Sequence, residues 1–283
     1  MNELKLIECP RDAMQGIKNF IPTQNKISYI NNLLSCGFDT IDFGSFVSPS
    51  AIPQMRDTAD VLKGLNDSST KLLAIIANER GAIDASNFER INYLGYPFSI
   101  SEEFQRRNTN SSIDESFILV EKIKEICLKK NKELVLYISM GFGNPYGEQW
   151  HPDIVSNWSY KLFNKLDVTI QSISDTIGCA DPLMVNSLIS SLLNNIDGVE
   201  FGVHLHSLPE NAKKLVESAY NAGCRRFDSA IKGFGGCPMA KDELVGNLPT
   251  ELMLEFFEDK NIETKINKTI FNSVIPETID LLT

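Results

Sequence analysis

Short β-rich runs alternate with helical patterns eight times within residues 4–259 of this 283-residue chain. Some of the runs, such as LLAIIAN at 72–78, are apolar throughout, as expected of a strand that is buried on both faces. Strict alternation of strands and helices indicates a parallel sheet, because each helix carries the chain back to the start of the next strand. Eight such units in one chain of this length predict a closed (β/α)₈ TIM barrel in a single α/β domain.

The alternative fold is an open doubly wound sheet, which requires a G-x-G-x-x-G turn after its first strand. Here that turn reads CPRDAMQG, and the look-alike GFGNPYG at 141–147 has the wrong spacing. Around the fourth unit we expect a helix over 85–94 and a strand over 97–101. Residues 1–260 are expected to form the barrel, and residues 261–283 an extension that packs on the barrel or at a subunit interface.

Composition excludes several classes of function. The 27 Lys and Arg residues against 37 Asp and Glu residues give a net charge of −10, which argues against binding to nucleic acid or to an anionic membrane. No run of about 18 apolar residues predicts a transmembrane helix, and the first residues lack the apolar stretch of a signal peptide. The six cysteines are scattered without a CxxC pair, which is typical of a cytoplasmic protein with reduced thiols.

In a barrel of this kind the chemistry lies at the carboxyl-terminal ends of the strands. Two of the three histidines, His204 and His206, end the seventh strand in the pattern HxH, so their side chains share one face. They are either two metal ligands or a pair of hydrogen-bonded interior histidines. Asp12 follows the first strand, and Asn247 follows the eighth, which lies between the first and the seventh in a closed barrel.

The set Asp12, His204, His206 and Asn247 offers two oxygens and two nitrogens, a mixture that suits Mg²⁺ or Mn²⁺ and does not exclude Zn²⁺. Taken alone, Asp12 is equally compatible with an ion pair to Arg11 or a turn cap. Asn247 alone, just before a helix, is compatible with a simple N-cap.

Other candidates lie at neighbouring strand ends. The glycine-rich loop KGFGGCP at 232–238 carries Cys237, which is either a thiol brought over the substrate or an incidental exposed cysteine. Asp42, near Ser45 at the end of the second strand, is a candidate base or a partner of Arg11. Asp175 ends the sixth strand and either orients a catalytic group or caps a turn.

The segments ECPRDAMQG, DFGSFVSPSAIPQM, SDTIG, VHLHS and GFGGCPMAKDELVGN occur in the order found in 3-hydroxy-3-methylglutaryl-CoA lyases, and the chain resembles this family over residues 4–258. The resemblance implies a metal-dependent barrel that cleaves 3-hydroxy-3-methylglutaryl-CoA to acetyl-CoA and acetoacetate, a reaction of leucine degradation. It also suggests an acyl-CoA substrate and a homodimer.

By the same resemblance, Asp12, His204, His206 and Asn247 hold the divalent metal. Arg11 stabilises the enolate oxygen, and Cys237 is a catalytic thiol. The resemblance leaves the general base open among Asp42, His204 and a metal-bound group, and we expect Asp42 to be the further catalytic residue. Substrate contacts are expected from Arg11, Gln15, Ser45 and Asp175.

The chain departs from the family pattern at three positions and by one extra residue between Cys237 and Asn247. Asp42 stands where the family has glutamate, Ser207 where it has aspartate, and Val135 where it has arginine. These changes leave open a related 3-hydroxyacyl-CoA as substrate. A Claisen-type condensing synthase on the same barrel is a further alternative, although such synthases usually carry a longer C-terminal extension, and a noncatalytic acyl-CoA-binding barrel is a third.

Overall fold

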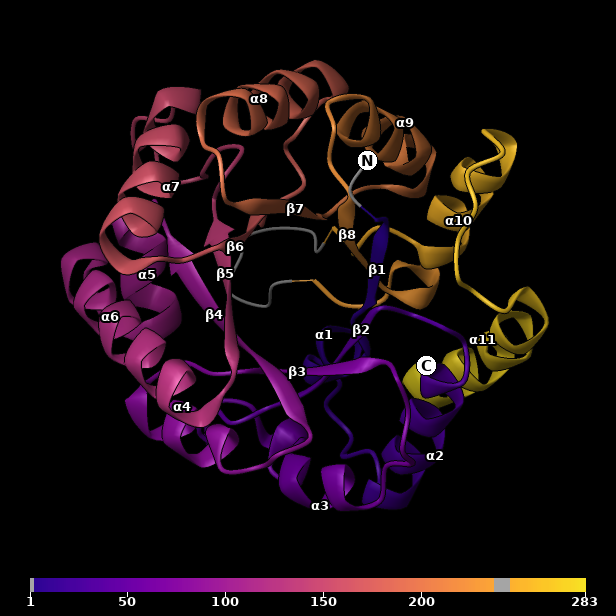
Figure 1. Cartoon of the computed structure of the whole chain (residues 1–283). Helices are drawn as coiled ribbons and strands as arrows, with labels where there is room; N and C mark the ends of the chain where they lie inside the picture. The colour runs from indigo at the N-terminus through magenta and orange to yellow at the C-terminus, as the bar shows by residue number, and fades with distance from the viewer. Residues whose placement is uncertain (1–2, 237–244) are drawn as a thin grey trace.

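The computed structural model describes residues 3–236 and 245–283. Within these residues, eight parallel strands close into a barrel in chain order, with β8 pairing back to β1. Figure 1 looks along the barrel and shows the helices as a ring around it. The predicted closed barrel is confirmed, and the open doubly wound sheet is excluded. The strands are β1 (Lys5–Glu8), β2 (Thr40–Ser45), β3 (Lys71–Ile75), β4 (Ile91–Ser99), β5 (Glu133–Ser139), β6 (Ile170–Asp175), β7 (Glu200–Leu205) and β8 (Arg226–Ser229).

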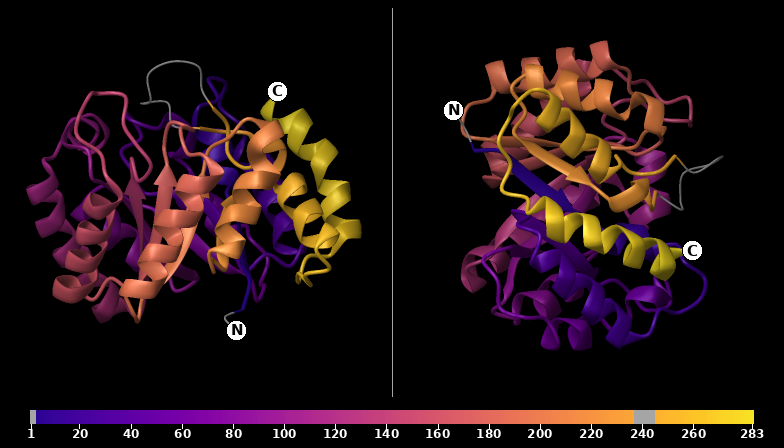
Figure 2. Two further views of the ribbon diagram at one scale, coloured as in Figure 1. Left: turned by 90° about the horizontal axis from the view of Figure 1, so that it is seen from above. Right: turned by 90° about the vertical axis from the view of Figure 1, so that its right-hand side faces the viewer.

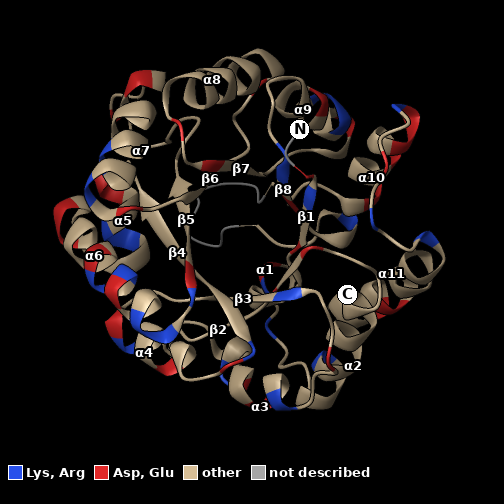
Figure 3. Ribbon diagram, in the orientation of Figure 1, with Lys and Arg blue, Asp and Glu red and all other residues tan. Residues whose placement is uncertain are grey.

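The helices cover the outside of the barrel and carry most of the charged residues (Figure 3). Local chemistry sets their ends: Ser112 and Glu115 form a capping box at the start of α6, and Asn131 ends it in the left-handed conformation. The α-helices are α1 (Pro10–Gln15), α2 (Thr23–Leu34), α3 (Thr58–Lys63), α4 (Glu79–Ser86), α5 (Glu102–Thr109), α6 (Ile113–Lys130), α7 (Pro152–Leu166), α8 (Pro182–Asn195), α9 (Pro209–Asn221), α10 (Thr250–Asp259) and α11 (Lys268–Leu282). Two short 3₁₀ turns are η1 (Pro53–Met55) and η2 (Ile231–Gly233).

The fourth unit differs from the prediction. The helix expected over 85–94 ends at Ser86, and the strand expected from Pro97 begins at Ile91. Pairing overrides local pattern here, because β4 is in register with β5 from Tyr93–Glu133 to Ser99–Ser139. Pro97 therefore lies inside a strand rather than opening one.

Three apolar clusters lie among the described residues, the smallest of them made of Met14, Ile21 and Met55. The largest lies between strands and helices, and a smaller cluster fills the barrel interior with Leu73, Tyr93, Val135, Tyr137 and Ile170. No helix among the described residues is long and apolar enough to cross a bilayer.

The C-terminal segment packs on the barrel. In α11, Phe271 makes an edge-to-face contact with Phe38 at 6.1 Å between ring centroids, and Glu277 accepts a 2.6 Å hydrogen bond from Asn32 of α2. Figure 2 shows the described N-terminal residues at one end of the barrel and the C-terminus toward the other.

Candidate active site

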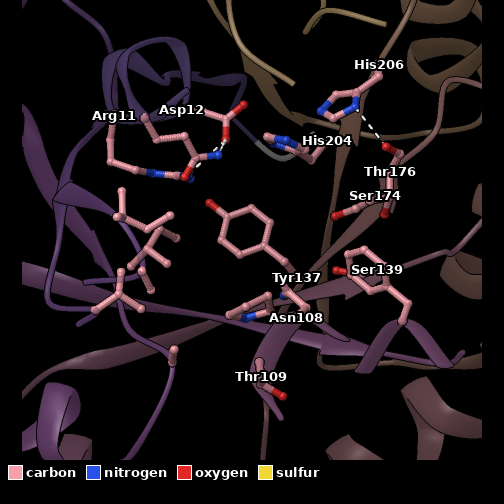
Figure 4. Close-up of a pocket in the computed structure, with 18 residues that line it drawn as sticks. Arg11, Asp12, Asn108, Thr109, Tyr137, Ser139, Ser174, Thr176, His204 and His206 are labelled. Atoms are coloured by element: carbon pink, nitrogen blue, oxygen red, sulfur yellow. Dashed lines mark hydrogen bonds and ion pairs between the residues drawn. The ribbon is translucent and has the colours of Figure 1, made fainter. Parts of the chain in front are cut away.

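The predicted polar side chains converge at the carboxyl-terminal mouth of the barrel. Arg11 and Asp12 lie on α1, the short helix that starts directly after β1, while His204 and His206 come from the end of β7. Figure 4 shows these four side chains around one cavity, with Tyr137 rising between them from β5. Residues nearly 200 positions apart in the chain thus share one site, as a closed barrel requires.

Arg11 is the hub of the acidic side of the site. Its Nε and Nη2 donate to Asp42 Oδ2 at 2.9 and 2.5 Å, and its Nη1 donates to Asp12 Oδ1 and Gln15 Oε1, each at 2.9 Å. Gln15 Nε2 in turn donates to Asp12 Oδ1 at 2.8 Å. The guanidinium is 8% exposed, so its orientation is fixed from three sides while it still lines the cavity.

Asn247 holds the other oxygen of Asp12. Its Nδ2 donates to Asp12 Oδ2 at 2.7 Å and to the carbonyl of Phe234 at 2.8 Å. The segment that carries it pairs with the end of β7, through a bridge between His206 and Asn247. The N-cap of α10 is Pro249, so the alternative of Asn247 as a helix cap is wrong.

The two histidines are held through their Nδ1 atoms. His204 Nδ1 lies 3.1 Å from Asp228 Oδ2, and His206 Nδ1 lies 3.2 Å from the carbonyl of Thr176. Such partners on Nδ1 fix the ring orientation and favour Nε2 as the atom available to a ligand. His206 Nε2 is buried and has no hydrogen-bond partner.

Burial and neighbouring charges shift the ionisation of the site. Burial and the nearby His204 lower the pKa of His206 to about 4, so this ring is neutral at physiological pH. Burial would raise the pKa of Asp12, but Arg11 and the two histidines outweigh it and hold it at about 2. Burial raises the pKa of Asp42 to about 6 in spite of Arg11.

The residues present fit a divalent metal. Asp12, His204 and His206 each offer a ligand atom, and these atoms lie within 4.8 Å of one another. Metal ligation requires a neutral imidazole and an ionised carboxylate, which are the protonation states of His206 and Asp12. In addition, His206 Nε2 is buried and has no hydrogen-bond partner, so it is available to a metal. Cys9 and Asp228 form a second such group with His204, on the side of the ring that hydrogen-bonds to Asp228.

Several functional groups were not identified from the sequence. Asp228 and Thr176 orient the histidines, and Tyr137, Asn108 and Thr109 line the cavity (Figure 4). The role of Asp228 could have been predicted from the sequence, because its strand, β8, is the neighbour of β7 and places it in register with His204. Asn108 and Thr109 had none, since they end helix α5, whose position depends on where β4 begins.

Of three further predicted residues, Asp175 follows the turn-cap alternative, Ser45 lies outside the cavity, and Cys237 is not described. Asp175 accepts hydrogen bonds from the backbone N–H groups of Cys179 and Ala180 at 3.0 and 2.9 Å, so its carboxylate caps the turn after β6. Ser45 is buried, and its hydroxyl has no partner. Neither residue lines the cavity. Cys237 lies outside the described residues.

An Asp/His-x-His group at the carboxyl-terminal mouth of a closed parallel barrel defines a class of divalent-metal enzymes. The sequence profile of the family described as HMGL-like matches residues 4–275. The chain therefore belongs to the HMGL-like family, which confirms the predicted resemblance and the predicted class of carbon–carbon lyase.

The relatives agree. Hydroxymethylglutaryl-CoA lyase YngG of Bacillus subtilis is 32% identical over 258 residues, covering 91% of this chain and 85% of the relative. A crystal structure of the Bacillus subtilis HMG-CoA lyase superposes with a TM-score of 0.92 at 30% identity, covering 100% of this chain and 94% of that one. The HMG-CoA lyase of Acenitobacter baumannii, solved with coenzyme A and 3-methylmalate, matches with a TM-score of 0.91 at 30% identity, over 99% and 91% of the two chains.

Proposed function

We propose that this chain cleaves 3-hydroxy-3-methylglutaryl-CoA to acetyl-CoA and acetoacetate in a reaction that depends on a divalent metal. The observation that carries the proposal is the pairing, in one cavity, of the Asp12–His204–His206 group with the fixed guanidinium of Arg11. Cleavage of a 3-hydroxyacyl thioester needs a polarised hydroxyl and a cation beside the thioester oxygen, and the two halves of the cavity supply these separately.

Asp12, His204, His206 and Asn247 would hold the metal. A bound divalent cation would acidify and orient the hydroxyl group on C3 of the substrate. The mixture of carboxylate, amide and imidazole groups suits Mg²⁺ or Mn²⁺ and also admits Zn²⁺. For Asn247 to contribute its oxygen, the amide group stays tethered by its Nδ2 to the carbonyl of Phe234.

The chain's own residues then handle charge and protons. Once the C3 hydroxyl loses its proton, the C2–C3 bond breaks, and its electron pair becomes the thioester enolate of acetyl-CoA. Arg11 would stabilise the enolate oxygen, because Asp42 and Gln15 already fix its orientation and no reorganisation is needed. Asp42, whose Oδ1 has no partner, is a candidate for the base. Cys237 is the predicted donor of the proton to the enolate carbon.

The departures from the family pattern bear on the choice of acyl-CoA. Asp42 is one methylene shorter than the glutamate of the family, yet it reaches Arg11 at 2.5 Å. Val135 is fully buried in the interior cluster and adds no charge there. Ser207 is buried, and its backbone N–H donates to the carbonyl of Gly246 at 2.9 Å. Since Asp42 contacts Arg11 in spite of its shorter side chain, we favour the 3-hydroxy-3-methylglutaryl substrate over a related 3-hydroxyacyl-CoA.

The test is acetoacetate release from the purified protein with 3-hydroxy-3-methylglutaryl-CoA, Mg²⁺ or Mn²⁺ and a thiol reductant, before and after EDTA. We expect metal-dependent acetoacetate and acetyl-CoA in equal amounts. His206→Ala should abolish turnover, whereas His151→Ala, at the exposed start of α7, is the matched control that should not.

Absence of product with the metal bound would reject this substrate, and related 3-hydroxyacyl-CoAs would then be screened. Formation of a condensed acyl-CoA from acetyl-CoA and a keto acid would instead identify a synthase. A homodimer and a cytoplasmic location are the partner and the compartment that we propose; light scattering and fractionation test them.

A further inference from the structure

One arginine lies inside the barrel and takes no part in the site described above. Arg226, on β8, is 1% exposed and is the largest fully buried side chain among the described residues. Its Nη1 donates to Glu200 Oε1 at 3.2 Å, near the amino-terminal end of β7, and Glu200 in turn accepts from Lys5 at 2.5 Å. Its Cζ lies 5.7 Å from the ring centroid of Tyr93 on β4. The side chain thus crosses the interior from β8 toward the opposite strand.

The neighbouring strand makes room for this side chain. Gly202 on β7 does not have a left-handed backbone, so its conformation does not require glycine. A Cβ added to Gly202 would lie 2.9 Å from both Cγ and Cδ of Arg226. Glycine inside a strand weakens it and often marks close approach of another group. The absence of a side chain at Gly202 therefore leaves the space that the methylene groups of Arg226 occupy.

Arg226 lies two residues before Asp228, the partner of His204, on the same strand. On a strand, residues two apart face the same side at about 6.6 Å, so Arg226 and Asp228 both face the barrel interior. Asp228 is in register with His204 and forms the hydrogen bond to its Nδ1. Nε and Nη2 of Arg226 and Oδ1 of Asp228 are all buried without a hydrogen-bond partner. Both side chains are buried, so the guanidinium is a cation of low solvent exposure on the same face of β8 as the Asp228 carboxylate.

We propose that Arg226 is a positioning residue of the metal site. It forms no hydrogen bond with Asp228; instead, its buried positive charge on the same face of β8 attracts the Asp228 carboxylate, which orients His204 so that Nε2 faces a divalent metal. The proposal rests on the metal site of the proposed function. Partners of metal-ligating histidines typically change metal affinity by about 10- to 100-fold when they are removed. Arg226 acts one group further away, so its removal should act at the low end of that range.

The test measures Mn²⁺ binding to the metal-free protein by electron paramagnetic resonance, with no substrate present. Arg226→Met should weaken Mn²⁺ binding about tenfold, and Arg226→Lys should recover part of the loss because it restores the charge. Arg225→Met is the matched control, since Arg225 stacks over Tyr220 and, among the described residues, donates to the backbone carbonyls of Tyr220 and Cys224. In turnover, Arg226→Met should raise the Mn²⁺ concentration needed for half-maximal rate more than it lowers kcat at saturating Mn²⁺.

Gly202→Ala tests the same idea without removing the charge. It should weaken Mn²⁺ binding in the wild-type background, by displacing the charged side chain of Arg226. In the Arg226→Met background the displaced side chain carries no charge, so the effect on Mn²⁺ binding should be smaller. Unchanged Mn²⁺ affinity in folded Arg226→Met, even with a lower Tm, would overturn the proposal, as would equal effects of Gly202→Ala in both backgrounds. No Mn²⁺ binding by the wild type would reject the metal site itself, a result that is distinct from either of these.

Discussion

Glu8 makes the stability of the barrel depend on pH in a direction opposite to that of most carboxylates. It is fully buried at the end of β1, where Oε1 accepts from the backbone N–H of Ile231 at 2.8 Å and Oε2 accepts from Thr250 Oγ1 at 2.6 Å. These contacts join Glu8 to the segments on either side of residues 237–244. Burial raises the pKa of Glu8 from 4.5 to about 8.

Because the folded-state pKa is the higher one, the folded protein keeps this proton between about pH 4.5 and about pH 8. The stability that the proton contributes is complete below the unfolded pKa and is lost as the pH rises through the folded pKa. A shift from 4.5 to about 8 at 1.36 kcal/mol per pKa unit amounts to about 4 kcal/mol lost between pH 5 and pH 9. Glu8→Gln, which keeps the shape without the titration, should remove this component.

The assay is urea unfolding of metal-free wild type and variant at pH 5, 7 and 9, followed by far-ultraviolet circular dichroism. Glu8→Gln should be more stable than the wild type at pH 9 by a few kcal/mol, and close to it at pH 5. Glu121→Gln, on the exposed face of α6, is the matched control for loss of a carboxylate. If wild type and Glu8→Gln lose stability in parallel from pH 5 to pH 9, Glu8 is ionised throughout and the reasoning fails.

Three further predictions concern the site. His206→Ala should weaken Mn²⁺ binding by more than about 100-fold while leaving the unfolding midpoint close to that of the wild type, as measured by calorimetric titration and urea unfolding; an unchanged affinity would remove His206 from the ligand set. Asp42→Asn should lower kcat/KM by about 10²-fold by loosening Arg11, and Asp42→Glu should retain more activity, so equal rates for both variants would contradict a positioning or base role. Cys237→Ala should lower kcat by about 10²- to 10⁴-fold with acyl-CoA affinity within about twofold, and a normal kcat would show that the thiol is incidental.

The fold was predictable because it depends on a repeated pattern. Each β-rich run and each helix that starts at a proline can be recognised from a few neighbouring residues. Helices α7, α8, α9 and α10 begin at or next to the expected prolines. Residues 91–94 were misjudged because INYL is compatible with a helix or a strand when read alone. Pairing with β5, which is 40 residues further along the chain, decides the matter and has no local signature.

The site was predictable where a strand end carried a distinctive residue. His204, His206 and Asp12 come together because closure of the barrel brings β7, β8 and β1 side by side. The Arg11–Asp42 contact was one of the alternatives, and the structure confirms the pairing. The turn cap at Asp175 was likewise one of two alternatives, and the hydrogen bonds of the folded turn decide in its favour.

The polar groups inside the barrel explain why this architecture tolerates a costly interior. The cluster around Leu73, Val135 and Ile170 follows the usual apolar filling of such barrels. Nearer the mouth, Asp42 Oδ1, Asp228 Oδ1 and the hydroxyl of Tyr137 are buried without hydrogen-bond partners. Each such group lowers the stability by about 1–3 kcal/mol relative to a satisfied one, so they would not be kept for folding alone. These groups lie at the end of the barrel where Arg11 and the histidines converge. We infer that the apolar cluster and the outer helices stabilise the fold, whereas the polar groups at the mouth are kept for function.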